Sequence, residues 1–155
     1  MSACEGAKRV RVASPFGPLV LTDEGGLITR LSWGGEGDDE TPLLLEAAAQ
    51  LADYFAGRRR VFDLPLAFLP GLNGAVQRAM CAIPMGEVRT YGDLSKALGA
   101  PAQAIGQACG SNPIPILIPC HRILSATGLG GFSAPGGVET KVALLKHEGA
   151  ASLLI

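Results

Sequence analysis

Short apolar runs with partial alternation of apolar and polar positions predict a small β-sheet in the first part of the chain. Residues 8–13 and 18–22 are rich in Val and Leu and are separated by turn-forming residues, so they predict a hairpin. Residues 27–33 follow two glycines and predict a third strand. The acidic, glycine-containing segment 34–40 is typical of a loop.

The apolar spacing then changes to that of a helix over residues 43–55. Thr41 is a suitable N-cap, Pro42 suits the first helical position and Gly57 suits the end. Residues 61–69 predict one more extended segment, and a Pro-Gly pair at 70–71 indicates a domain boundary. We therefore expect an N-terminal α/β domain, a sheet with a helix, over residues 1–70 and a second domain over 71–155.

The second domain has mainly helical patterns. They predict helices over residues 73–83, 91–98, 101–109 and 138–148, with Thr90 as the N-cap of the second. The short helices 91–98 and 101–109, joined by a tight turn with a glycine, are typical of a helix-turn-helix. Small side chains cover most of helix 101–109, which suits either a DNA groove or close packing in a core. The fold class is therefore α+β.

The stretch 111–124 holds the strongest candidate for chemistry. Residues 116–118 predict a short buried strand that Pro119 ends, which places Cys120 at a rim. A thiol beside a histidine can lose its proton and become a nucleophile, and His121 follows directly. The alternative is that Cys120 only fills the core. Glu148 at a helix C-terminus opposes the helix dipole, so it is either a partner that orients His121 or an exposed terminal glutamate.

Composition narrows the class of protein. The 155 residues are 48% apolar, and no run approaches the roughly 18 apolar residues of a membrane span. We expect a cytoplasmic protein with reduced cysteines, because no signal pattern begins the chain. The four cysteines show no CxxC spacing and only two histidines are present, so we expect no metal and no cofactor. Net charge is −1, and the slight positive balance lies in the second half.

Two further segments are open to more than one interpretation. Residues 58–60 are three arginines at a helix end, which suits a solvated charge cluster better than a phosphate site. Residues 128–137 form a glycine-rich loop that can bring backbone donors close to a ligand, but they lack a P-loop pattern. A plain solvent loop is the alternative.

Four blocks of sequence resemble the O6-alkylguanine-DNA alkyltransferases, the methylated-DNA-protein-cysteine methyltransferases. The blocks are residues 83–92, residues 110–124 with Pro119-Cys120-His121-Arg122, residues 131–133 and residues 141–149. The Pro-Cys-His-Arg block with its upstream Asn-Pro is highly specific to that family. Together the blocks cover about residues 72–149, and the first domain resembles the family's more variable N-terminal domain.

The resemblance implies a suicide DNA repair enzyme. The thiolate of Cys120 would attack the alkyl carbon on guanine O6 and keep it as a permanent thioether, with O4-alkylthymine as a further candidate substrate. His121, acting through a water, would take the thiol proton, while Glu148 would hold the imidazole tautomer. Asn112 matches the asparagine that ties the recognition helix to the active-site loop.

The resemblance also implies how the substrate is held. The partner would be double-stranded DNA containing O6-alkylguanine, whose damaged nucleotide is flipped into the pocket of a monomer. In the pocket, Tyr91 would contact the base, Ser133 would donate to O6, the carbonyls of Cys120 and Ile123 would accept from the guanine amine, and Cys109 would line the wall. The expected DNA-contacting residues are Thr90, Ala102, Gln103, Ala104 and Arg122.

Two positions depart from the family pattern. Gln103 stands where an arginine usually fills the gap left by the flipped base, and Gln77 stands where a tryptophan is common. Glutamine adds no charge and less stacking area, so we expect weaker and less salt-dependent DNA binding. Two alternatives to the repair enzyme are a non-repairing alkyltransferase-like lesion-binding protein and a thiol enzyme unrelated to DNA. Retention of Cys120, His121 and Glu148 favours the enzyme.

Overall fold

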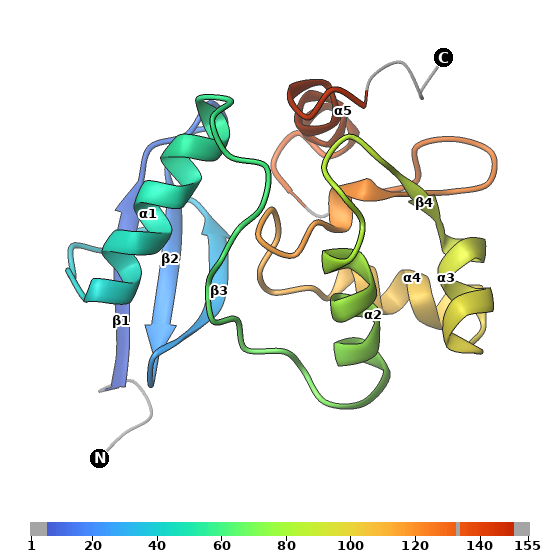
Figure 1. The fold of residues 1–155 in the computed structure, drawn as a ribbon, viewed down its shortest axis with the longest axis horizontal. Coiled ribbons are helices and arrows are strands. Elements are labelled where there is room, and N and C mark those ends of the chain that lie inside the picture. The colour runs from blue at the N-terminus through green and yellow to red at the C-terminus, as the bar shows by residue number, and fades with distance from the viewer. Residues whose placement is uncertain (1–5, 133, 151–155) are drawn as a thin grey trace. The chain divides into compact units, whose positions relative to one another are not determined.

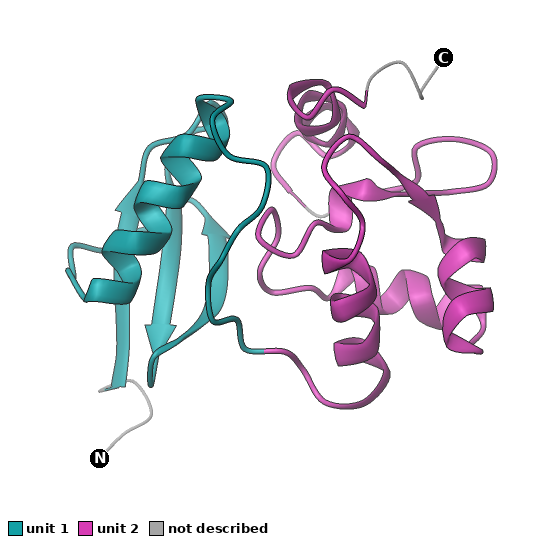
Figure 2. Ribbon diagram, in the orientation of Figure 1, with its two compact units in different colours: residues 1–67 teal, residues 68–155 magenta. Residues whose placement is uncertain are grey.

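The computed structural model describes residues 6–132 and 134–150 and has the α+β fold class predicted above (Figure 1). The chain divides into two compact units, residues 1–67 and 68–155 (Figure 2). Within the described residues, no helix has the length and apolarity needed to cross a membrane.

The first unit is a three-stranded antiparallel sheet with a helix. Strands β1 (Ala7–Val12), β2 (Leu19–Glu24) and β3 (Leu27–Trp33) lie in sequence order, so the predicted hairpin and third strand are confirmed. Helix α1 (Pro42–Phe55) packs on the sheet (Figure 1). The apolar positions of both elements meet in a core that includes Leu19, Leu21, Ile28, Leu44 and Leu51.

Thr41 caps α1, as its sequence position predicts. Its hydroxyl oxygen accepts a hydrogen bond from the backbone N–H of Leu44 (3.1 Å) and its hydroxyl donates to the carboxylate of Asp23 (2.7 Å). The same carboxylate accepts from the backbone N–H of Gly26 (3.0 Å) in the turn between β2 and β3. One buried acidic side chain therefore joins the start of the helix to a turn of the sheet.

The extended segment predicted over residues 61–69 is much shorter in the structure. It makes one isolated bridge, between Leu66 and Ile28, with backbone hydrogen bonds from Ile28 to Pro65 and from Ala67 to Ile28. Pro65 has no N–H to donate, which limits further pairing.

The second unit contains four helices and a two-stranded sheet among its described residues. They are α2 (Gly71–Cys81), β4 (Arg89–Thr90), α3 (Tyr91–Leu98), α4 (Ala102–Gly110), a single 3₁₀ turn η2 (Cys120–Arg122), β5 (Ile123–Leu124) and α5 (Val138–His147). Helix α4 packs on both α2 and α3. The helix-turn-helix arrangement is present: α3 ends at Gly99, whose φ of 65° reverses the chain, and α4 begins three residues later.

Two sets of side-chain hydrogen bonds hold the start of α3 and the segment that leads into α2. Thr90 and Asp93 form a reciprocal capping box at the start of α3, with hydrogen bonds of 3.1 and 2.9 Å. Gln77 on α2 is fully buried, and its side-chain oxygen accepts from the backbone N–H of Leu69 (2.7 Å). Gln77 therefore ties α2 to the segment that leads into it.

The prediction of a strand over residues 116–118 is wrong. These residues form a compact buried turn in which Ile118 N–H donates to the carbonyl of Ile114 (2.9 Å), and Ile116 has a φ of 70°. The nearby prolines lack the N–H groups that a ladder requires. The short strand of this region is instead β5, which follows Cys120 and pairs in parallel with β4.

Candidate active site

Cys120 opens the 3₁₀ turn η2 and is half-buried at the wall of a cavity of about 210 Å³. A cavity of about 150 Å³ accommodates a benzene ring, so this space is of a size suited to a flat ring. The cavity is lined by α3, α4, the turn before Cys120 and the glycine-rich loop, through Tyr91, Gly106, Cys109, Gly110, Asn112, Pro115, Cys120, Gly131 and Phe132.

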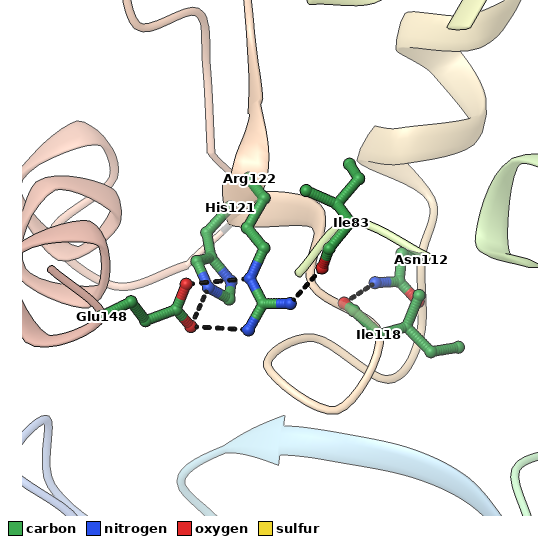
Figure 3. Close-up of polar contacts among 6 residues, drawn as sticks. All are labelled: Ile83, Asn112, Ile118, His121, Arg122 and Glu148. Atoms are coloured by element: carbon green, nitrogen blue, oxygen red, sulfur yellow. Dashed lines mark hydrogen bonds and ion pairs between the residues drawn. The ribbon is translucent and has the colours of Figure 1, made fainter. Parts of the chain in front are cut away.

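His121, which directly follows Cys120 in the chain, forms a buried pair with Glu148. Figure 3 shows the two side chains facing each other. His121 Nε2 lies 2.7 Å from Glu148 Oε2, and both side chains are fully buried. Arg122 joins them: its Nε and Nη2 donate to the two oxygens of Glu148 (2.8 and 3.0 Å), and its Nη1 donates to the carbonyl of Ile83 (2.6 Å). The carboxylate that α5 presents therefore holds two consecutive side chains of η2.

The protonation states of this cluster follow from its contacts. Burial would raise the pKa of Glu148, but hydrogen bonds from His121 and Arg122 outweigh it and lower the pKa to about 2. Burial lowers the pKa of His121 in spite of Glu148, so the imidazole is neutral near pH 7. An ionised Glu148 accepts the Nε2 proton, which leaves the lone pair on Nδ1. That nitrogen is buried and, among the described residues, has no hydrogen-bond partner.

Asn112 holds the turn that leads to Cys120. Its side-chain Nδ2 donates to the carbonyl of Ile118 (3.0 Å; Figure 3), and its Oδ1 accepts from the backbone N–H of Ile114 (3.1 Å). Because Asn112 lies two residues after the end of α4, these bonds tie the C-terminal end of that helix to the cysteine turn.

The thiols of the cavity are protonated at rest. Burial raises the pKa of Cys120, while a hydrogen bond from Asn112 and the charge of Lys141 act against this rise. Burial raises the pKa of Cys109 to about 12. Burial, followed by the charges that the two thiols would carry, raises the pKa of Tyr91. Cys120 therefore needs a base at the moment it reacts, and a neutral imidazole stands beside it in the chain.

Most of the pocket residues predicted from the sequence line the same cavity in the structure. Tyr91, Cys109, Asn112 and Cys120 line one cavity. Ser133 lies outside the described residues. The carbonyl of Ile123, expected to accept from the guanine amine, accepts from Lys141 Nζ (2.5 Å), which leaves one further lone pair.

Arg122 does not fit its predicted contact with DNA, and that prediction is corrected. Its side chain is 7% exposed, and its guanidinium is bound to Glu148 and to the carbonyl of Ile83. A basic residue after an apolar run suggests a surface position, and its acidic partner lies 26 residues further along the chain. Of the other expected DNA contacts, Ala102 and Gln103 are exposed on α4, Ala104 is half-buried, and Thr90 is half-buried in its capping box.

Sequence reasoning missed Lys141, which is fully buried and hydrogen-bonded to the backbone carbonyls of Ile123, Leu129 and the cavity-lining Gly131. The position of Lys141 in the helical pattern of the sequence could have indicated that it is buried. Lys141, Leu144, Leu145 and Glu148 follow the i, i+3, i+4, i+7 pattern of one helix face, so a lysine occupies a position where an apolar residue is expected.

Comparison with known proteins gives consistent matches in both units. The family model described as the 6-O-methylguanine DNA methyltransferase DNA-binding domain matches residues 72–150, and that of the ribonuclease-like domain of the same proteins matches residues 11–68. The methylated-DNA–protein-cysteine methyltransferase of Mycobacterium bovis is 39% identical over 88% of this chain and 89% of its own length. The constitutive enzyme of Bacillus subtilis is 38% identical over 87% and 91%.

Solved structures show the same similarity. The crystal structure of Mycobacterium tuberculosis O6-methylguanine methyltransferase matches with a TM-score of 0.81 and 34% identity over 94% of each chain. The crystal structure of Mycobacterium tuberculosis OGT in complex with DNA matches with a TM-score of 0.77 and 36% identity, covering 91% of this chain and 92% of that one.

Proposed function

The chain belongs to the 6-O-methylguanine DNA methyltransferase family, and on that premise we propose that Cys120 is the residue that accepts the alkyl group. The protein is an enzyme of DNA repair that acts by alkyl transfer. The observation that carries the assignment of Cys120 is its place at the cavity wall, directly before the buried His121–Glu148 pair.

The proposed reaction is a single displacement. The sulfur of Cys120 forms a bond to the alkyl carbon as the bond between that carbon and guanine O6 breaks. The thiol proton passes, through a water, to Nδ1 of His121, and Glu148 stabilises the imidazolium that forms. Tyr91 lies at the cavity with its hydroxyl protonated and is the proposed donor to the departing guanine, with Ser133 as the donor to O6. The thioether is permanent, so each molecule reacts once.

We propose that the substrate is O6-alkylguanine in double-stranded DNA, flipped out of the helix into the cavity. Two features of the cavity support a flipped base as its occupant. Its size suits a base, and it is lined in part by α4, the second helix of the helix-turn-helix, which is the helix that enters the DNA groove in such motifs. Ala102, Gln103, Ala104 and Thr90 would face the DNA. Gln103 would fill the gap in the base stack.

We further propose that residues 1–70 and 71–155 are the two domains and that the protein acts as a monomer, because every cavity-lining residue comes from the second unit of one chain. A nucleophilic thiol that must stay reduced suits the cytoplasm.

The test is the mass of the protein after incubation with duplex DNA containing one O6-methylguanine. We expect the protein to gain one methyl group in place of a hydrogen, located on the Cys120 peptide, and to be inert towards a second equivalent of DNA. Cys120→Ser should gain nothing, whereas the control Cys81→Ser, which alters an exposed cysteine away from the cavity lining, should react fully. DNA binding without an adduct would instead identify a lesion-binding protein, and an adduct on Cys109 would refute the assignment of Cys120.

A further inference from the structure

Two of the residues that line the cavity are glycines of α4, and the backbone does not require glycine at either position. Gly106 and Gly110 lie four residues apart, so they share one face of the helix with Cys109. Neither has a positive φ. A glycine within a helix is less stable than an alanine, because it loses more conformational entropy on folding. Another feature of the structure must therefore account for these two residues.

Close packing does not account for them either. A Cβ on Gly106 or Gly110 would meet no atom within 4 Å beyond its chain neighbours and the backbone of its own helix. Gly74 of α2 shows the contrast, since a Cβ there would overlap the carbonyl oxygen of Leu69. Gly106 is half-buried and Gly110 is exposed, so the free space beside them is the cavity and its mouth.

The two glycines leave the α4 wall of the cavity bare on the side that faces the reacting sulfur. Cys109, on the same helix face, lines the same cavity as Cys120. Burial, followed by a negative charge on Cys120, raises the pKa of Cys109 to about 12, so this wall lies within electrostatic reach of that sulfur. An alkyl group whose first carbon approaches Cys120 must extend along such a wall.

The other walls of the cavity suit an apolar group. Tyr91 and Phe132 line it with aromatic rings, and Pro115 adds a further apolar ring. Aromatic rings pack well against one another, face to edge or offset. The cavity therefore combines ring-bearing walls with one wall that carries almost no side chain.

We propose that Gly106 and Gly110 are specificity-determining residues, which let the cavity accept guanine whose O6-alkyl group is larger than methyl, including one that carries an aromatic ring. The inference rests on the proposed role of Cys120 as the acceptor. With a benzyl group, the bond from sulfur to the benzylic carbon forms as the bond from that carbon to O6 breaks. The thiol proton goes to His121, as in methyl transfer, and guanine leaves.

The test compares two substrates that differ only in the alkyl group. Two duplexes of one sequence carry a single O6-methylguanine or a single O6-benzylguanine, and single-turnover transfer is followed by the mass of the intact protein. The ratio of the benzyl rate to the methyl rate cancels DNA binding, because the duplex is the same. The variants are Gly106→Ala and Gly110→Ala. The matched control is Gly92→Ala, which makes the same change on α3 outside the cavity lining.

We expect the unaltered protein to accept both groups. Gly106→Ala should lower the benzyl-to-methyl ratio by about 10–200-fold, the range that one carbon changes in an apolar pocket. Gly110→Ala, at the exposed mouth, should lower it less, and Gly92→Ala should leave it unchanged. A ratio unchanged in both cavity variants would overturn the role of the glycines. So would an equal loss of both rates, because the glycines would then serve the approach of α4 to DNA.

Thermal unfolding separates cavity space from packing. Alanine is the better helix former, so where nothing obstructs the Cβ each cavity variant should raise Tm by about 1–4 °C. A fall in Tm would show that the glycines serve packing and would overturn the proposal. If the unaltered protein forms neither adduct, the function of Cys120 fails. If it forms the methyl adduct and never the benzyl adduct, only the inferred substrate class fails.

Discussion

Replacing Glu148 with glutamine should disable transfer and destabilise the fold together. The side chain keeps its shape but loses the charge that binds His121 and Arg122 over 2.7–3.0 Å in a fully buried setting. Glutamine has only one carbonyl oxygen to accept hydrogen bonds, and its NH₂ group would face the N–H donors of His121 or Arg122 without being able to accept from them. His121 would then lose the acceptor that fixes its Nε2 proton, so Nδ1 is no longer reliably the free base.

The magnitude follows from the pKa of Glu148, which the contacts lower from 4.5 to about 2. A shift of this size corresponds to about 3 kcal/mol of stability at neutral pH, and breaking a buried ion pair typically costs about 3–5 kcal/mol. For a chain of this length, 3 kcal/mol lowers Tm by roughly 6–12 °C. Loss of a general base typically slows a reaction by about 10²–10⁴-fold.

The pH dependence has a definite sign. Glu148 has a lower pKa in the folded than in the unfolded protein, so its contribution is complete above about pH 4.5 and is lost as pH falls towards about 2. The stability curves of the unaltered protein and Glu148→Gln should therefore run parallel at neutral pH and converge across that interval.

Two assays check this. Single-turnover transfer from O6-methylguanine DNA gives the rate, and thermal unfolding from pH 7 down to the lowest pH at which the protein stays folded gives the stability difference. Glu139→Gln on the exposed face of α5 is the matched control and should change neither. A Glu148→Gln protein that transfers methyl at the normal rate would refute the base assigned to His121, and a stability difference independent of pH would refute the buried ion pair.

Two further changes test other parts of the chain. Gln103→Arg should tighten duplex binding and steepen its salt dependence, adding up to about 0.9 to the slope of log K against log salt if the new guanidinium neutralises one phosphate. Binding titrations at several salt concentrations measure this, and an unchanged slope would show that residue 103 does not approach the DNA. Thr41→Ala should lower stability by about 0.5–2 kcal/mol, because it removes the cap of α1 and the bond to Asp23, while leaving transfer intact. A Tm equal to that of the unaltered protein would contradict the cap's contribution.

Local patterns predicted most of the secondary structure. The strands β2 and β3, the helix α3 and the caps Thr41 and Thr90 depend on neighbours within a few residues, which the chain order alone supplies. The exceptions are the segment 61–69, which makes only one isolated bridge, and the segment 116–118. The apolar run of the latter suggested a strand, yet the prolines around it removed the N–H donors that a ladder needs, and the segment forms a buried turn.

The sequence by itself therefore determined the elements, the reactive block around Cys120 and, through the family resemblance, the chemistry expected there. Only the tertiary structure decided which charges meet. From its place in the sequence Arg122 looks like a surface cation, but in the structure it binds Glu148, 26 residues away. Lys141 donates to carbonyls up to 18 residues distant. Chain order encodes contacts within a turn or a helix face, whereas the partner of a buried charge depends on which distant segments the fold brings together.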